Sequence, residues 1–119
     1  MTKEIRTLCD IFLSAAASGK PDLLLSKVAG TWRPIAAADF GFTVRALSLG
    51  LNGLGLQPGD RIAILSENRP EWAMADYAIQ CAGGWSVPIY PTLPAGQIAA
   101  LLKDCAARAL FVSTAEQLA

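Results

Sequence analysis

The second half of the chain alternates short apolar runs with amphipathic stretches, and this alternation constrains the fold more than any other feature. Three apolar runs have the length of buried strands, at 61–65 (RIAIL), 85–90 (WSVPIY) and 109–112 (ALFV). Between them lie two segments of helical periodicity, each opened by a proline, Pro70 and Pro94. The resulting β-α-β-α-β order predicts parallel strands joined by right-handed crossovers.

This order is typical of half of a doubly wound parallel sheet. If the strands lie in the sheet in sequence order, both helices cover the same face. Pro88 lacks the N–H group that a central ladder needs, so its strand is predicted to lie at an edge or to carry a bulge. Pro58 and Gly59 are placed for a type II turn before the first strand.

The first half of the chain reads as helix, hairpin and helix. Apolar residues from Ile5 to Ala16 recur at helical spacing, and Gly19 ends the pattern. Strands are predicted at 23–28 and 31–35 around an Ala29-Gly30 turn. A second helix carries one apolar stripe formed by Phe40, Val44, Leu47, Leu51 and Leu54. Three glycines inside it, Gly41, Gly50 and Gly53, are predicted to mark points of close packing, because glycine is otherwise costly in a helix.

The predicted fold class is therefore α/β. N-terminal amphipathic helices and a small β-hairpin, residues 1–58, precede a β-α-β-α-β subdomain, residues 59–119. The final residues contain Ser113 and Glu116, spaced as a capping box that opens a helix, yet the chain ends at Ala119. We therefore expect the two parts to form one partial domain, truncated at the start of a helix.

Composition excludes several classes of function. Ten basic residues balance ten acidic ones, so no basic excess attracts nucleic acid or an anionic membrane. The chain has no histidine, which removes Ser-His-Asp and Cys-His catalysis and histidine metal ligands. Its 53% apolar content is high for a globular chain. We therefore expect apolar faces that the chain cannot bury and possible partners in the remainder of its own polypeptide or in self-association.

The three cysteines, Cys9, Cys81 and Cys105, are widely spaced and odd in number. This pattern argues against a disulfide framework or a zinc site and favours a reducing cytoplasm, with Cys9 and Cys105 as small buried hydrophobes on the apolar faces of helices. Charged residues interrupt the N-terminus, so it does not resemble a signal peptide, and no apolar run approaches the ~20 residues of a membrane span.

Two segments are candidates for ligand contact. The glycine-rich segment 53–59 lies after a helix and before a strand, the reverse of a dinucleotide-binding loop, and is interpreted as a helix stop and turn. The segment 66–69 follows the first parallel strand, where ligands of α/β sheets bind. It either touches a substrate or partner domain, or forms a solvated turn in which Asn68 caps the next helix.

Other candidates are weaker. Glu67 and Glu71 are expected to be exposed, with nothing to raise the pKa of either one selectively for acid–base catalysis. The tryptophans Trp32, Trp72 and Trp85 are interpreted as packing residues, because no cations accompany them on one face. The prediction is therefore no catalytic, no cofactor-binding and no metal-binding residue in this chain.

Two stretches carry a resemblance to a known family. Residues 59–72 (GDRIAILSENRPEW) and 82–94 (AGGWSVPIYPTLP) resemble the adenylate-forming enzymes, the superfamily of acyl-CoA synthetases, luciferase and peptide-synthetase adenylation domains. The second stretch is similar to the family's A-G-x-x-x-V-P core motif. The segments SENRPEW and PIYPTLP resemble sequences of the long-chain fatty-acyl-CoA synthetase branch.

The resemblance implies a parent enzyme that is an AMP-forming ligase of fatty acid metabolism, using ATP, Mg²⁺ and CoA in the cytoplasm, with peripheral contact to a membrane left open. The fatty acid is activated to an acyl-adenylate and then transferred to CoA. The family's phosphate loop and catalytic lysine lie outside this chain, so the chain alone is expected to be an inactive N-terminal fragment. The alternative is a stand-alone flavodoxin-like binding or interaction module without catalysis.

Overall fold

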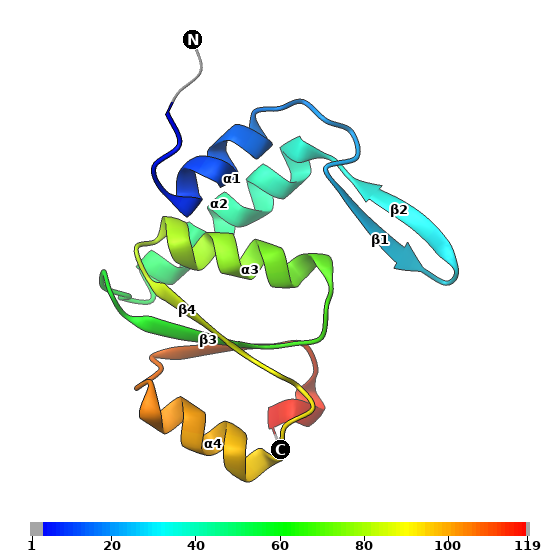
Figure 1. The fold of residues 1–119 in the computed structure, drawn as a ribbon. Helices are drawn as coiled ribbons and strands as arrows, with labels where there is room; N and C mark the ends of the chain where they lie inside the picture. Colours follow the sequence, from blue (N-terminus) through cyan, green and yellow to red (C-terminus); the bar gives the residue numbers. More distant parts are fainter. Residues whose placement is uncertain (1–3, 119) are drawn as a thin grey trace.

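A three-stranded parallel sheet lies between two helical layers in the computed structural model, which describes residues 4–118 (Figure 1). The strands are β3 (Arg61–Leu65), β4 (Trp85–Ile89) and β5 (Ala109–Val112), in the spatial order β4-β3-β5. Both pairings are parallel, with Ile64 opposite Pro88 in one and Phe111 in the other. The predicted α/β class and the three parallel strands are confirmed.

The strand order corrects the expectation that both crossover helices cover one face. Because β3 is central, the chain moves one way from β3 to β4 and back past β3 to β5. Right-handed crossovers then place the two helices on opposite faces. Accordingly α3 (Pro70–Cys81) and α4 (Ala95–Asp104) lie on either side of the sheet (Figure 1).

The central strand β3 is buried on both faces, which explains its continuous apolar run. Ile62 and Ile64 face the helical layer that contains α3, whereas Ala63 and Leu65 face α4, where Ile98 and Leu102 pack. Strand β4 pairs with β3 alone, so Pro88 lies on an edge strand as predicted. Gly59 has φ +83°, as the predicted type II turn requires, and the Asp60 N–H donates to the Gln57 carbonyl at 3.0 Å.

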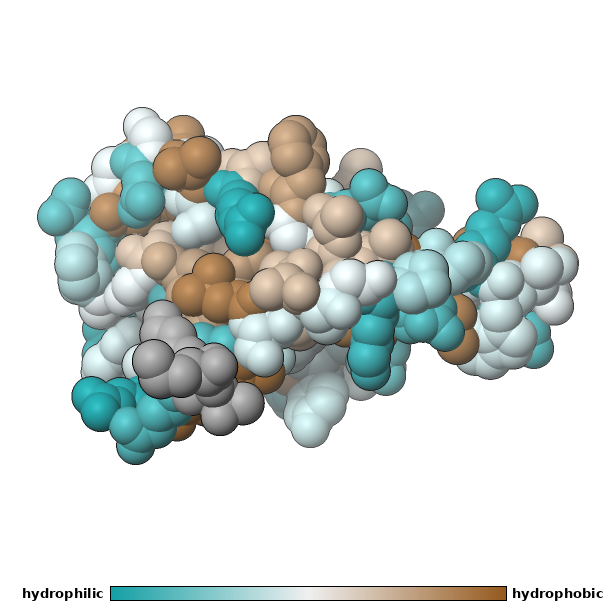
Figure 2. Space-filling view, turned by 90° about the horizontal axis from the view of Figure 1, so that it is seen from above, coloured by the Kyte–Doolittle hydropathy of each residue, from teal (hydrophilic) through white to brown (hydrophobic). Residues whose placement is uncertain are grey.

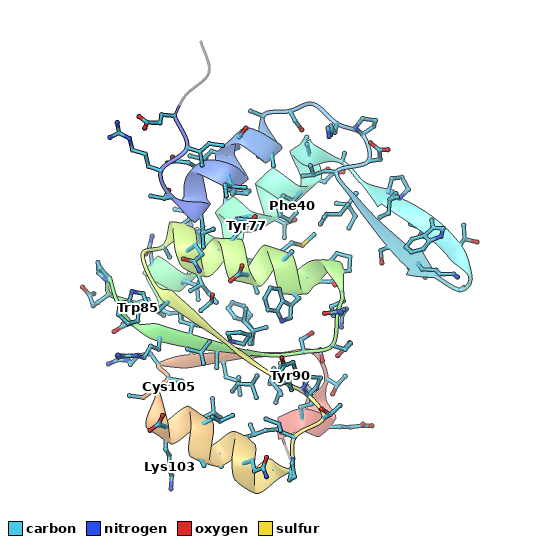
Figure 3. The ribbon with its side chains drawn as sticks, in the orientation of Figure 1. Phe40, Tyr77, Trp85, Tyr90, Lys103 and Cys105 are labelled. Atoms are coloured by element: carbon cyan, nitrogen blue, oxygen red, sulfur yellow. A yellow bond between two sulfur atoms is a disulfide. The ribbon has the colours of Figure 1, made fainter. Side chains whose placement is uncertain are left out.

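The N-terminal half packs onto α3. Helices α1 (Leu8–Ala16) and α2 (Ala37–Gly53) form the outer layer, and strands β1 (Leu24–Val28) and β2 (Thr31–Ile35) form a projecting antiparallel hairpin (Figure 1). Phe12, Phe40 and Tyr77, one from each of the three helices, meet with ring centroids 5.8–6.1 Å apart. Phe40 and Tyr77 are labelled between their helices in Figure 3. This aromatic cluster joins the N-terminal half to the sheet layer.

Helix α1 begins at Leu8, later than its apolar pattern, because Thr7 and Asp10 form a capping box. The Asp10 N–H donates to the Thr7 hydroxyl, and the Thr7 N–H donates to the Asp10 carboxylate, both at 3.1 Å. This arrangement satisfies amide donors that the helix itself leaves unpaired.

The prediction that the cysteines form no disulfide is wrong. The structure joins Cys9 in α1 to Cys81 at the end of α3 by a disulfide, while Cys105 is free. The Cα atoms of the bonded pair lie 5.2 Å apart, within the range that a disulfide spans. The two residues are 72 positions apart, so only the packing of α1 on α3 brings them together.

The glycines of α2 divide into two kinds. A Cβ atom at Gly41 would lie 3.0 Å from the Cβ of Ala16 in α1, so close packing is confirmed there. At Gly50 and Gly53 a Cβ would meet nothing within 4 Å, so the same prediction is wrong for these two.

Two substitutions in this one helix test the distinction. We expect Gly50→Ala to raise the free energy of unfolding by about 0.5–1 kcal/mol, because alanine lowers the entropy cost of the helix without meeting a neighbour. Gly41→Ala should give no gain or a loss, because its methyl group pushes against α1. Urea unfolding of both variants measures the difference, and an equal gain in the two would contradict the packing assignment.

Candidate functional site

Polar residues gather where the parallel strands end. Ser66 and Glu67 follow β3, Tyr90 follows β4 and Ser113 follows β5. Figure 3 labels Tyr90 at this end of the sheet, opposite the end that carries Trp85. The carboxyl ends of parallel strands are the usual ligand-binding edge of an α/β sheet. We call this edge the strand-end site.

Two hollows make up the strand-end site, one of about 220 Å³ beside β5 and one of about 500 Å³ beside β4. Ser66 and Trp72 line both. Trp72 is half-buried and packs against the main core, so it forms the wall between the two hollows and is not a solvent-facing residue. Tyr90 is 77% exposed and borders the larger hollow.

Charged side chains pair with one another in the strand-end site. The Arg69 guanidinium donates to the Glu71 carboxylate at 2.8 Å, and a second nitrogen lies 3.6 Å from the Glu67 carboxylate. The hydrogen bond to Arg69 lowers the pKa of Glu71 below its usual value, and the bond to Glu71 raises the pKa of Arg69. All three side chains are exposed to solvent, so the pairs contribute little to stability and chiefly fix the shape of the loop.

Ser113 links the ends of β3 and β5, a contact that the sequence reasoning missed. Its hydroxyl donates to the Glu67 carboxylate at 2.6 Å, and its backbone N–H donates to the Gln117 side chain at 3.2 Å. The bond from Ser113 lowers the pKa of Glu67. Glu67 follows β3 and Ser113 follows β5, and these two strands are adjacent and parallel. This placement is the one sequence signal that could have predicted their contact.

These contacts correct two sequence predictions. The capping box of Ser113 and Glu116 does not form, because the Ser113 hydroxyl bonds to Glu67 and residues Ala115–Leu118 form a 3₁₀ helix instead of an α-helix. Asn68 is not the cap of α3. The N-cap is Arg69, which makes no side-chain cap, and Pro70 occupies the first turn as expected. The predicted exposure of Glu67 and Glu71 is confirmed.

A substitution at Ser113 tests the hydrogen bond that carries the Glu67 assignment. We expect Ser113→Ala to raise the pKa of Glu67 toward its ordinary value, because the carboxylate loses its strongest donor. In the native protein the folded-state pKa is depressed, so the associated stability is present above the ordinary pKa. It is lost as the pH falls through the folded value.

Carboxyl NMR titration of both proteins measures this shift. Thr114→Ala, one residue further along the chain, is the matched control and should leave the Glu67 titration unchanged. An unchanged Glu67 pKa in the Ser113 variant would contradict the assignment.

The glycine-rich segment 53–59 offers no phosphate site. Its backbone N–H groups already have partners: those of Leu54 and Leu56 bond to the last turn of α2, and that of Gly59 bonds to the Gly83 carbonyl at 2.9 Å. A phosphate loop needs free amide donors. The interpretation as a helix stop and turn is therefore confirmed.

Within the strand-end site, the described side chains offer a polyphosphate no excess of positive charge. In the strand-end site two carboxylates face one guanidinium, a net charge of −1 that repels a polyphosphate. Over residues 4–118, no group of three or more acidic, cysteine or histidine side chains converges as a metal site would require. No step of an ATP-dependent reaction is therefore derived from these side chains.

The interpretation of Trp32 and Trp85 as packing residues is wrong, because both side chains are largely exposed. Trp32 is 61% exposed on the hairpin, with the Lys27 ammonium 5.7 Å from its ring centroid. Trp85 is 59% exposed, with the Arg61 guanidinium 5.2 Å from its ring centroid. Each tryptophan therefore has a cation beside it, which sequence spacing did not indicate, but the two pairs lie on separate elements and form no stacking platform.

A family model decides the relationship of this chain to known proteins. The model for the AMP-binding enzyme matches residues 13–119. The chain belongs to the AMP-binding enzyme family. This membership agrees with the resemblance found at residues 59–94, and it does not favour the alternative of a stand-alone flavodoxin-like module.

Individual proteins that are similar to this chain match most of its length. A long-chain-fatty-acid–CoA ligase, FadD15 of Mycobacterium bovis, is 41% identical over 96 residues, 79% of this chain and 16% of the relative. The chain therefore spans about a sixth of the length of that curated relative. Among solved structures, a putative long-chain-fatty-acid CoA ligase from Rhodopseudomonas palustris matches 90% of the chain and 26% of its own, with 28% identity and a TM-score of 0.75.

The fold recurs in a solved structure of lower sequence identity. The N-terminal subdomain of NpsA from Klebsiella oxytoca, solved with 3-hydroxyanthranilyl-AMSN, matches 93% of this chain and 28% of its own at 23% identity and a TM-score of 0.78. Two solved structures with different titles thus share the overall fold of this chain. The predicted α/β fold class is therefore shared with both structures.

Proposed function

We propose that this chain is the N-terminal portion of an AMP-forming long-chain fatty-acid–CoA ligase. Its 41% identity to FadD15 carries the proposal, because that relative is named for this activity. The parent reaction activates a fatty acid carboxylate with ATP to an acyl-adenylate and transfers the acyl group to CoA. Mg²⁺ and CoA belong to the parent enzyme, in the cytoplasm. No helix within residues 4–118 is long and apolar enough to cross a membrane.

The role of this portion is structural support for catalysis carried out elsewhere in the polypeptide. The strand-end site carries a net negative charge, and the backbone N–H groups of segment 53–59 are already hydrogen-bonded. Both observations support a structural role for this portion. We therefore propose that the chain alone has no catalytic, cofactor-binding or metal-binding residue and no ligase activity. Residues 1–58 and 59–119 act as two parts of one partial domain.

Reconstitution in two pieces tests the proposal. FadD15 lacking the stretch aligned with this chain is mixed with this chain, ATP, Mg²⁺, CoA and a long-chain fatty acid, and pyrophosphate release is measured. We expect release from the mixture and from neither piece alone. Calorimetry of the chain with millimolar ATP and Mg²⁺ should show no saturable heat. Pyrophosphate release by the chain alone, or none from an assembled mixture, would contradict the proposal.

Exposed apolar side chains on and beside α2 support the proposal that this surface contacts the remainder of the polypeptide. Phe42, Leu49 and Leu54 are 70–79% exposed, and an apolar hollow of about 590 Å³ runs from α2 to Phe111 on β5. Figure 2, which looks down on the outer helical layer, shows apolar surface spread between polar side chains. Surface of this kind marks protein contacts.

The isolated chain is expected to use the same surface for self-association. Sedimentation at increasing concentration should show dimers or larger species, because apolar side chains of α2 are exposed and their burial against a second copy is favourable. Replacing Phe42 and Leu54 by serine should return the protein to a monomer. A native chain that stays monomeric at high concentration would contradict this prediction.

A further inference from the structure

The Cys9–Cys81 disulfide links α1, a short helix with a single buried side chain, to α3. Helix α1 has nine residues, and Phe12 is its one buried residue. A helix of this length is unstable in water without tertiary contacts, because nucleation is unfavourable and few hydrogen bonds follow it. The docking of α1 therefore rests on the Phe12 contacts with Phe40 and Tyr77, on the packing of Ala16 against α2, and on the disulfide.

Neither bonded cysteine is fully buried. Cys9 and Cys81 are both half-buried, and Cys81 packs against the main core. Cys105 lies at the end of α4, across the sheet from α1 (Figure 3), with its sulfur 3.6 Å from the Leu102 carbonyl. Cys9 and Cys81 therefore form a half-buried pair, and Cys105 is a separate free thiol that serves as an internal control.

We propose that Cys9 and Cys81 are a reversible thiol–disulfide exchange site whose substrates are small-molecule disulfides of the glutathione class. One cysteine thiolate attacks the disulfide, giving a mixed disulfide and releasing one thiol. The other cysteine then attacks the mixed disulfide, giving the Cys9–Cys81 bond and releasing the second thiol. Two protein thiols are oxidised, and one small-molecule disulfide is reduced to two thiols.

The exchange controls how firmly α1 covers the aromatic cluster. With the bond closed, α1 is tied to α3, and the unfolded or detached states of residues 9–81 lose chain entropy. With the bond open, Phe12 and the smaller contact of Ala16 anchor α1, so local detachment exposes Phe40 and Tyr77. A reducing cytoplasm holds the pair open, and an oxidising shift closes it. This inference does not depend on the ligase activity.

Redox titration of the whole chain tests the site. The protein is equilibrated in reduced and oxidised glutathione at graded ratios, and free thiols are alkylated and counted by mass spectrometry. We expect one alkylated thiol, Cys105, in the oxidised protein and three in the reduced protein, with Cys9 and Cys81 changing together. Three alkylated thiols at every ratio, or a bond that persists in excess reduced glutathione, would overturn the proposal.

Thermolysin cleavage reports the docking of α1, because this protease cuts beside the apolar residues of α1 once the helix detaches. We expect cleavage within residues 8–16 to be on the order of tenfold faster in the reduced protein, through local unfolding. Cys9→Ser and Cys81→Ser should each be cleaved at the fast rate whatever the redox state, whereas Cys105→Ser should keep the redox dependence. Circular dichroism checks that the variants are folded. Equal cleavage of oxidised and reduced native protein would overturn the control of α1.

Discussion

Replacing Phe12 by alanine should lower the free energy of unfolding by about 3–5 kcal/mol, the largest effect that we expect from a single substitution. Phe12 is 2% exposed and contacts both Phe40 and Tyr77, with ring centroids at 5.8 and 6.0 Å. Its loss leaves a cavity at the point where three helices meet, and α1 keeps no other buried side chain.

Urea unfolding followed by tryptophan fluorescence measures this loss. Phe42→Ala is the matched control, because Phe42 is 75% exposed and its truncation should change stability by no more than about 0.5 kcal/mol. Measurements are made with the disulfide closed in both variants. A loss below about 1 kcal/mol for Phe12→Ala would mean that α1 does not pack as described.

Replacing Gly84 by valine should cost about 3 kcal/mol, because no space exists for a side chain there. A Cβ atom would lie 3.1 Å from the Asp60 carbonyl oxygen, 3.1 Å from Ile79 and 3.2 Å from Ile62. The carbonyl is backbone and accepts a hydrogen bond from the Trp85 N–H at 2.8 Å, so it cannot move without opening the start of β4.

Gly96→Val is the matched control for Gly84→Val. A Cβ at Gly96, in the first turn of α4, would meet nothing within 4 Å, so its stability should change by no more than about 0.5 kcal/mol. Thermal unfolding of both variants gives the comparison. Equal losses at the two glycines would contradict the close approach at Gly84.

The local features of the fold could be predicted from sequence because each depends on neighbouring residues. The run at 61–65 reads as a strand buried on both faces, Pro88 excludes a central position for β4, and Pro58-Gly59 specifies its turn. Residues 59–94 also contain sequence motifs that are specific enough to indicate the family.

The remaining features depend on contacts between distant segments, and no local pattern determines these. The central place of β3 reverses the direction of the second crossover, which sends α4 to the other face of the sheet. The Cys9–Cys81 bond requires α1 to lie on α3, and the Ser113–Glu67 bond joins residues 46 positions apart. Ser113 had a plausible local partner in Glu116, and the long-range partner displaced it.

The central claim is that this chain supplies the N-terminal part of a long-chain fatty-acid–CoA ligase, and a chimaeric enzyme tests it most directly. In FadD15 the 96-residue stretch aligned with this chain is replaced by the corresponding residues of this chain. Palmitate-dependent pyrophosphate release is then measured with ATP, Mg²⁺ and CoA. We predict a rate within about tenfold of the unaltered ligase, equivalent to about 1.4 kcal/mol in the activation barrier. A folded chimaera without palmitate-dependent release would contradict the claim.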